Sequence, residues 1–167
     1  MDREKHMMQA ALRRFSTLEF AIFRPAGNCT GLFSKIIRDF NQRKIIADVL
    51  QKTFPNVEQV GFINPDPDHA ELVMTGGEFC GNATSSAAYH ILQGQPGKIS
   101  IKVSGVKKKL QAGVTKEGES FSQMPVYADP AYVQSDPKHP GNYLVFLEGI
   151  THYIDFDAKQ IKGLSKD

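Results

Sequence analysis

The sequence predicts an α+β protein, because two stretches with helical periodicity lie among short, β-prone apolar segments. Its 167 residues are 41% hydrophobic and 23% charged, an ordinary globular composition that suits one domain, or one domain and part of another. The segments with the apolar character of strands are residues 18–23, 57–63, 70–74, 99–103, 108–114, 120–125, 143–147 and 151–156.

The first expected strand leads through a turn into the first expected helix. Residues 18–23 end at a loop of turn-forming residues, 24–28. Ser34 is a suitable N-cap for a helix, which the Phe54-Pro55 pair would end. The apolar residues at helical spacing are Ile36, Ile37, Phe40, Ile45, Ile46, Val49 and Leu50.

A hairpin and a second helix are expected next. The turn-forming run 64–68 (NPDPD) separates the strands 57–63 and 70–74, which predicts that these strands pair with each other. Residues 83–92 are rich in small, helix-compatible residues and end before the turn signal of residues 94–97 (GQPG). The remaining strands of the first part follow this helix.

The chain is expected to contain three parts of unequal length. Residues 1–17 are an N-terminal extension that could start a short helix, residues 18–126 form a complete N-terminal domain, and residues 127–167 form a crossover and the incomplete start of a second domain. Three prolines within residues 128–141 favour a linker there. Only one expected strand pair follows it, which is too little to bury a core of its own.

Charge and cysteine content exclude several classes of function. A net charge of +2 is too small to indicate binding to nucleic acid or to a membrane surface. Cys29 and Cys80 cannot form a disulfide framework, and without a signal peptide or a long apolar run they indicate a reducing cytoplasm with both thiols free. The histidines lack the spacing of metal ligands, so we expect no metal.

Residues 76–84 (GGEFCGNAT) carry the pattern with the most chemical content. A thiol directly before a helix faces the unpaired N–H groups of the first turn, and the helix dipole favours its thiolate. We therefore expect the pKa of Cys80 to fall from about 8.5 toward neutrality. The same N–H groups can hold a carboxylate, Gly81 lets a substrate approach the backbone, and Asn82 can cap the helix or donate its amide. A thiolate beside a bound carboxylate suits chemistry at the α-carbon.

Other interpretations of this segment have less support or stay open. A buried cysteine at a helix start is usually a small hydrophobic residue, and the flanking glycines are what argue against that here. Glu78 stands where a dinucleotide-binding fingerprint needs its second glycine, and no lysine follows Gly81 as a P-loop requires. A hydrolase that uses Cys80 and His152 stays open, although the segment matches no such local signature.

Residues 78–84 (EFCGNAT) resemble the first catalytic-cysteine motif of the diaminopimelate epimerase-like superfamily, which comprises cofactor-independent, two-cysteine racemases and epimerases. Residues 25–28 (PAGN) resemble its N-terminal Gly-Asn loop, and residues 58–62 (EQVGF) resemble the segment whose glutamine faces the substrate. Residues 149–152 (GITH) resemble a segment at the start of its second domain. The run from 59 to 84 is most similar to the histidine racemase branch.

This resemblance implies two similar α/β domains, each a mixed curved sheet around a central helix, with the active site between them. It implies an isomerase without pyridoxal phosphate or metal, in which one cysteine removes the α-proton and a second returns one to the opposite face. For His152, a surface position at a strand end is an equally good interpretation. The implied residues are Cys80 and His152 as catalytic, Gly81 and Asn82 on the substrate carboxylate, and Asn28 and Gln59 in contact with the substrate.

The sequence departs from the superfamily pattern at the second base, because no cysteine follows Cys80. Cys29 is better explained as a packed core thiol than as that base. We expect a racemase chain without its opposite-face acid. Such a chain would either lack a C-terminal half or associate with a second copy. The alternatives are a non-catalytic small-molecule binding module and a phenazine-biosynthesis-type isomerase on the same fold; the cysteine at position 80 argues against the latter.

Overall fold

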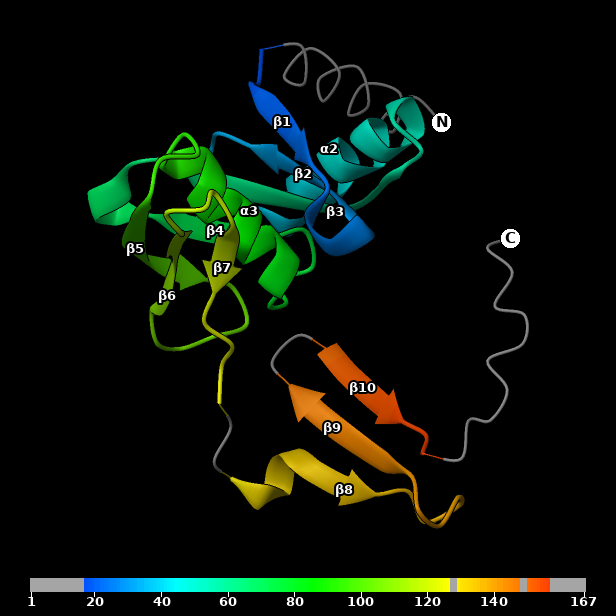
Figure 1. Ribbon diagram of the computed structural model, residues 1–167. Coiled ribbons are helices and arrows are strands. Elements are labelled where there is room, and N and C mark those ends of the chain that lie inside the picture. Colours follow the sequence, from blue (N-terminus) through cyan, green and yellow to red (C-terminus); the bar gives the residue numbers. More distant parts are fainter. Residues whose placement is uncertain (1–16, 127–128, 148–149, 157–167) are drawn as a thin grey trace, which may run out of the picture. The chain divides into compact units, whose positions relative to one another are not determined.

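The computed structural model describes residues 17–126, 129–147 and 150–156 of the chain. The chain divides into two compact units, Met1–Pro125 and Val126–Asp167, and each is described here by itself. The short helix expected near the N-terminus lies outside the described residues. The α+β class is confirmed, because the described residues of the first unit combine a mixed sheet with two α-helices (Figure 1).

The sheet of the first unit has seven strands whose order follows the chain. Two neighbouring pairs, β2 with β3 and β4 with β5, are parallel, whereas the other four pairs are antiparallel. The hairpin expected around residues 64–68 is present as β3 and β4. The strands are β1 (Phe20–Phe23), β2 (Cys29–Phe33), β3 (Val57–Asn64), β4 (Glu71–Met74), β5 (Gly97–Val103), β6 (Leu110–Val114) and β7 (Ser120–Ser122).

Two helices, α2 (Phe40–Thr53) and α3 (Gly81–Ile91), cover opposite faces of this sheet. Successive side chains of a strand point to opposite faces. Accordingly, Leu32 of β2 packs in the core cluster that contains α3, whereas its neighbour Phe33 packs in the cluster that contains α2. Helix α3 contacts β2, β3, β5, β6 and β7, so the curled sheet wraps around it (Figure 1).

Helix α2 begins later than the sequence predicted. Ser34 is not its N-cap, because residues 35–39 are not helical; the Ser34 N–H continues the β1–β2 pairing by donating to the carbonyl of Glu19. The Ser34 hydroxyl instead lies 3.2 Å from Nε2 of His90. The cap is Asp39, whose carboxylate accepts a hydrogen bond of 2.7 Å from the N–H of Gln42. Aspartate and serine are both good N-caps. Here Ser34 ends the β1–β2 pairing, and Asp39 caps the helix.

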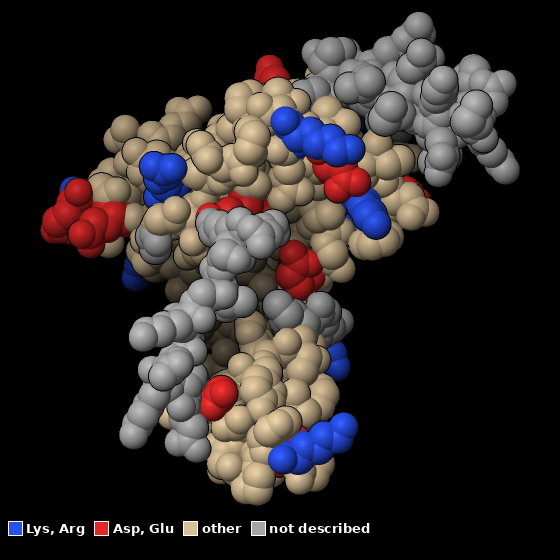
Figure 2. All heavy atoms as spheres, turned by 90° about the vertical axis from the view of Figure 1, so that its right-hand side faces the viewer, with Lys and Arg blue, Asp and Glu red and all other residues tan. Residues whose placement is uncertain are grey.

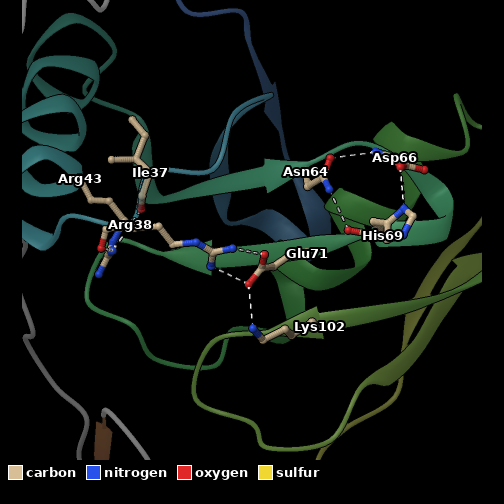
Figure 3. A network of polar contacts seen from close by, with 8 residues as sticks. All are labelled: Ile37, Arg38, Arg43, Asn64, Asp66, His69, Glu71 and Lys102. Atoms are coloured by element: carbon tan, nitrogen blue, oxygen red, sulfur yellow. Dashed lines mark hydrogen bonds and ion pairs between the residues drawn. The ribbon is translucent and has the colours of Figure 1, made fainter.

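The irregular segment before α2 is attached to the sheet by ion pairs (Figure 3). The guanidinium of Arg38 forms two hydrogen bonds with the carboxylate of Glu71 on β4, which also lies 3.2 Å from the ammonium of Lys102 on β5. Arg38 holds the pKa of the Glu71 carboxyl below its usual range, against the opposing effect of burial, and Lys102 adds to the lowering. The network thus joins this segment to two adjacent strands.

Two strands were not predicted from the sequence. All five residues of β2 are buried, so the strand lacks the alternation of polar and apolar residues that reveals a half-exposed strand. The other, β8 (Val133–Ser135), lies in the stretch interpreted as a linker, where three of the prolines occur. It follows a short 3₁₀ helix at Pro130–Tyr132 and forms the edge of the sheet of the second unit.

The second unit is a three-stranded antiparallel sheet in the order β10-β9-β8. Strands β9 (Tyr143–Leu147) and β10 (Ile150–Ile154) form the expected pair. The side chain of Asn142, which is buried, donates a hydrogen bond of 2.7 Å to the hydroxyl of Tyr153. The interpretation of residues 127–167 as the start of a second domain stays a prediction.

The surface carries both signs of charge. On the face shown in Figure 2, lysine and arginine side chains lie among aspartate and glutamate side chains. Residues 107–109, the lysine run, are exposed in the turn between β5 and β6. Within the described ranges, neither long helix has the length and hydropathy needed to span a membrane.

Candidate active site around Cys80

The loop between β4 and α3 places Cys80 and is fixed at both ends. At its start, the N–H and the hydroxyl of Thr75 both donate to the carbonyl of Val60 on β3. Near its end, the hydroxyl of Ser104 donates to the carbonyl of Glu78 over 2.7 Å and accepts from the N–H of Met74 over 2.9 Å. Gly77 has a φ of +88°, a conformation that favours glycine. The thiol is therefore presented by a defined turn.

Arg43 of α2 provides a further anchor for this loop. Its side chain is buried, and its Nε donates to the carbonyl of Thr75 over 3.1 Å. Its Nη1 donates to the carbonyls of Ile37 and Arg38, as Figure 3 shows for the labelled residues. The guanidinium thus satisfies three backbone carbonyls and ties α2 to the loop that carries Cys80. This role could not be predicted from the sequence, because nothing local distinguishes Arg43 from a surface arginine.

Cys80 lies directly before α3, as the sequence predicted, and is its N-cap, whereas Asn82, the cap considered from the sequence, lies inside the helix. The Cys80 sulfur accepts a hydrogen bond of 3.4 Å from the N–H of Ala83, and the Cys80 carbonyl accepts from the N–H and the hydroxyl of Thr84. The thiol itself donates to Oε1 of Gln59, on β3, over 3.0 Å. The sequence placed Gln59 near the substrate, and the structure places it against the sulfur.

The predicted lowering of the Cys80 pKa is wrong. Burial raises the pKa of this thiol above its usual value, because the thiolate would lose water. The N–H groups of Ala83 and Asn82 act in the expected direction and lower the pKa, but each by less than burial raises it. The carboxylate of Glu78 raises the pKa further. The resting state of Cys80 at neutral pH is therefore the thiol.

Cys80 opens onto a pocket of about 510 Å³ formed by η1 (Pro25–Gly27), α3 and β7. Gly81 lies under Met124, since a Cβ at this position would lie 3.2 Å from the methionine sulfur. The hydroxyl of Ser122 donates to the carbonyl of Gly81 over 3.2 Å and links β7 to the start of α3. The residues that line the pocket are Pro25, Cys80, Gly81, Asn82, Ser85, Ser120, Phe121, Ser122 and Met124.

The structure brings together most of the residues predicted for the site. Cys80, Gly81 and Asn82 line one pocket, and Gln59 contacts the sulfur of Cys80. Asn28 is half-buried directly after η1, where its N–H donates to the carbonyl of Pro25, which is itself a lining residue. Its contact with substrate stays a prediction.

The two remaining residues of interest lie on the strands β10 and β2. His152 is exposed on β10 of the second unit, and its supporting role stays a prediction. Cys29 is buried on β2, as expected for a core thiol. Among the described residues, no three histidine, cysteine, aspartate or glutamate side chains gather closely enough to hold a metal ion.

The pocket walls from β7 were not predicted as part of the site. Ser120, Phe121 and Ser122 carry no recognisable spacing, and only the curling of the sheet around α3 brings them to Cys80. Ser85 could have been suspected, because it lies one turn after Asn82 on the same helix face. Its hydroxyl donates to the carbonyl of Asn82 over 3.0 Å.

Several known histidine racemases are similar to this chain. Residues 17–165 match the family described as the histidine racemase CntK N-terminal domain. Histidine racemases from two strains of Fusobacterium nucleatum subsp. nucleatum are each 31% identical, over 92% and 91% of this chain and 59% of their own length. The histidine racemase of Staphylococcus aureus strain Mu50 is 34% identical over 58% of this chain and 38% of its own length.

The chain thus spans about 59% of the length of the Fusobacterium relatives. The match to the family covers both units, including the segment around Cys80. This chain belongs to the histidine racemase CntK N-terminal domain family.

Proposed function

We propose that this chain supplies one half of the active site of a cofactor-independent amino-acid racemase, with Cys80 as the acid and base on one face of the substrate. The observation that carries the proposal is a thiol at the start of a helix that opens onto a pocket and contacts a polar side chain. The histidine racemases among its relatives support histidine as the first substrate to test.

The start of α3 offers a place for the substrate carboxylate. The first turn of a helix has N–H groups without intrahelical partners and carries the positive end of the helix dipole. In the proposed complex, the carboxylate lies against the backbone of Gly81 and Asn82, and the α-carbon faces the sulfur of Cys80. Both residues line the pocket with Cys80.

The proton moves between the sulfur and the α-carbon. In one direction, a base on the far face removes the α-proton, and the S–H bond of Cys80 breaks as a new C–H bond forms. In the other direction, the thiolate removes the α-proton, and an acid on the far face replaces it. Because burial raises the pKa of Cys80, the resting thiol is suited to the proton-donating direction.

The walls of the pocket favour a substrate whose side chain is neutral and polar. Ser85, Ser120 and Ser122 contribute hydroxyl groups, and Phe121 and Met124 contribute apolar surface. A neutral imidazole can exchange hydrogen bonds with hydroxyls and stack on an aromatic ring, whereas a second carboxylate would need a positive partner. This supports histidine over a diacid.

The proposal includes the diaminopimelate epimerase-like fold and a second acid-base group from another source. The curled sheet around α3 is consistent with that fold. No cysteine follows Cys80 in these 167 residues, and the relatives are longer. We place the far-face acid-base group in protein beyond this chain or in a second copy. His152 is proposed to support the site. The free thiols are suited to a cytoplasmic location.

Deuterium uptake at the α-carbon tests the proposal. The chain is incubated with L- or D-histidine in D₂O, and α-deuterium is measured by mass spectrometry together with the ratio of enantiomers. We expect exchange that exceeds inversion, because one thiol can act on only one face. Cys80→Ala should abolish the exchange, and Cys29→Ala, the matched control, should retain it. Uptake that survives Cys80→Ala would reject Cys80 as the base, and a non-catalytic binding module would give no uptake.

A further inference from the structure

A buried hydroxyl on β2 has no hydrogen-bond partner. Thr30 is 0% exposed, and its Oγ1 is one of two buried side-chain oxygens without a partner among the described residues. Buried polar groups are nearly always paired, because an unpaired one forfeits its bonds with water. This hydroxyl therefore requires an explanation.

Thr30 lies beside the residue that contacts the Cys80 sulfur. In the parallel pairing of β2 and β3, Thr30 is the partner of Gln59, and Leu32 is the partner of Gly61. Partners in a ladder share a face of the sheet. The face is the one toward α3, since Leu32 packs in the α3 core and a Cβ on Gly61 would lie 3.0 Å from Leu32.

The amide of Gln59 is oriented for only one protonation state of Cys80. Its Oε1 accepts a hydrogen bond from the thiol. A thiolate has no proton to donate, so the same orientation would place the carbonyl oxygen against a negative sulfur. Rotation of the amide about its last bond would instead present an N–H to the thiolate and turn Oε1 away from it. In that orientation, Oε1 needs a new donor.

We propose that Gln59 and Thr30 form a two-position relay that follows the protonation state of Cys80, with the Thr30 hydroxyl as the donor that holds the rotated amide. With the thiol, the Gln59 carbonyl accepts from sulfur and Thr30 stays unpaired. With the thiolate, the Gln59 N–H donates to sulfur and Thr30 donates to Oε1. Gln59 touches the reacting sulfur, whereas Thr30 is a positioning residue. The benefit to catalysis rests on the proposed function of Cys80 as acid and base.

No cationic side chain among the groups described around Cys80 takes over the stabilisation of its thiolate from the Gln59 amide. Glu78, in the loop before the cysteine, opposes the thiolate. The pocket lining from η1, α3 and β7 contributes no ionisable side chain besides Cys80 itself. On the strand side, the guanidinium of Arg24 interacts with Cys29 and Glu58. Gln59 forms a side-chain hydrogen bond with the sulfur, and its amide can change from acceptor to donor.

The test is the pH dependence of Cys80 alkylation by iodoacetamide in the full chain, with each cysteine followed separately by mass spectrometry. Thr30→Val keeps the shape of the side chain and removes the hydroxyl. We expect Cys80 to react about three- to tenfold more slowly at fixed pH below the midpoint, because the thiolate loses the support of the rotated amide. Gln59→Met should slow the reaction at least as much, since a bond to a charged sulfur is stronger than one to a neutral thiol.

The double variant and two controls make the test specific. If Thr30 acts through Gln59, Thr30→Val should change the pH profile little in a Gln59→Met background. Thr30→Ser keeps the hydroxyl and should restore the original profile. Ser86→Ala removes the other buried, unpaired hydroxyl, which lies about 9 Å along α3 from Cys80, and should leave the profile unchanged.

Two results would overturn the relay: identical profiles for Thr30→Val and the unaltered chain, or fully additive effects in the double variant. If Thr30→Val fails to fold, a profile of Gln59→Met equal to the unaltered one overturns it as well. A shifted profile without any deuterium uptake from amino acids would keep the relay and reject the proposed function, so the two failures are distinguishable.

Discussion

The two long helices of the first unit begin in different ways. At α2, an exposed carboxylate, that of Asp39, accepts a hydrogen bond of 2.7 Å from the N–H of Gln42. At α3, a half-buried sulfur, that of Cys80, accepts one of 3.4 Å from the N–H of Ala83. Sulfur is a weak acceptor, so α3 has the poorer cap. The helix start with the stronger cap faces solvent, whereas the one with the weaker cap lies at the pocket.

The largest expected effect comes from giving α3 a better cap. In Cys80→Ser, a hydroxyl replaces the thiol, and its oxygen accepts more strongly from the first turn. We expect α-proton exchange to fall by more than about 100-fold, because a hydroxyl is a far weaker base.

The free energies of unfolding of two variants at position 80 give the second half of this test. We expect Cys80→Ser to be more stable than Cys80→Ala by about 1 kcal/mol in urea unfolding followed by circular dichroism. Exchange at the unaltered rate in Cys80→Ser would contradict the assignment of the thiol. Equal stability of the two variants would show that position 80 does not act as a cap.

An intermediate effect is expected at the other helix. Asp39→Ala removes the cap of α2 and should lower the free energy of unfolding by about 1 kcal/mol. The pH midpoint of Cys80 alkylation should stay the same, because Asp39 does not contribute to the Cys80 pKa. Asp39→Asn retains an oxygen acceptor and serves as the control. A shifted midpoint in Asp39→Ala would show that the two helix starts are coupled.

The smallest expected effect concerns the charge beside the thiol. The Glu78 carboxylate raises the pKa of Cys80, so Glu78→Gln should lower that pKa and move the alkylation midpoint to lower pH. At neutral pH, we expect alkylation to become about twofold faster, and the gain should shrink at high salt. Glu117→Gln, in the exposed turn between β6 and β7, removes an equal charge and should have no effect.

Local patterns in the sequence were sufficient to predict that both helices exist and that a thiol lies at the start of one of them. The run of small residues after Cys80 and the turn signal after Leu92 define α3 within two residues. The strand β2 was missed because burial on both faces removes its alternation. The start of α2 was misplaced because Ser34 belongs to the end of the β1–β2 pairing, where its N–H donates to the carbonyl of Glu19. The unpredicted strand β2 is part of that pairing.

The chemistry of the site depended on contacts that the sequence could not reveal. The helix dipole predicted a lowered pKa for Cys80, but the burial that raises it arises from packing between segments distant in the chain. Ser122 and Met124 reach the pocket only through the curl of the sheet. The role of Gln59 in substrate contact stays a prediction, and its hydrogen bond with the sulfur of Cys80 was not predicted.

The strand order of the first unit has a consequence for folding. Because each of the seven strands pairs with its neighbour in the chain, every new segment that leaves the ribosome can dock on one already present, and little entropy is lost in closing each loop. Helix α3 is the exception, since it contacts β6 and β7 as well as β2 and β3. The Cys80 pocket therefore forms only after β6 and β7, the latter ending at Ser122, have been synthesised.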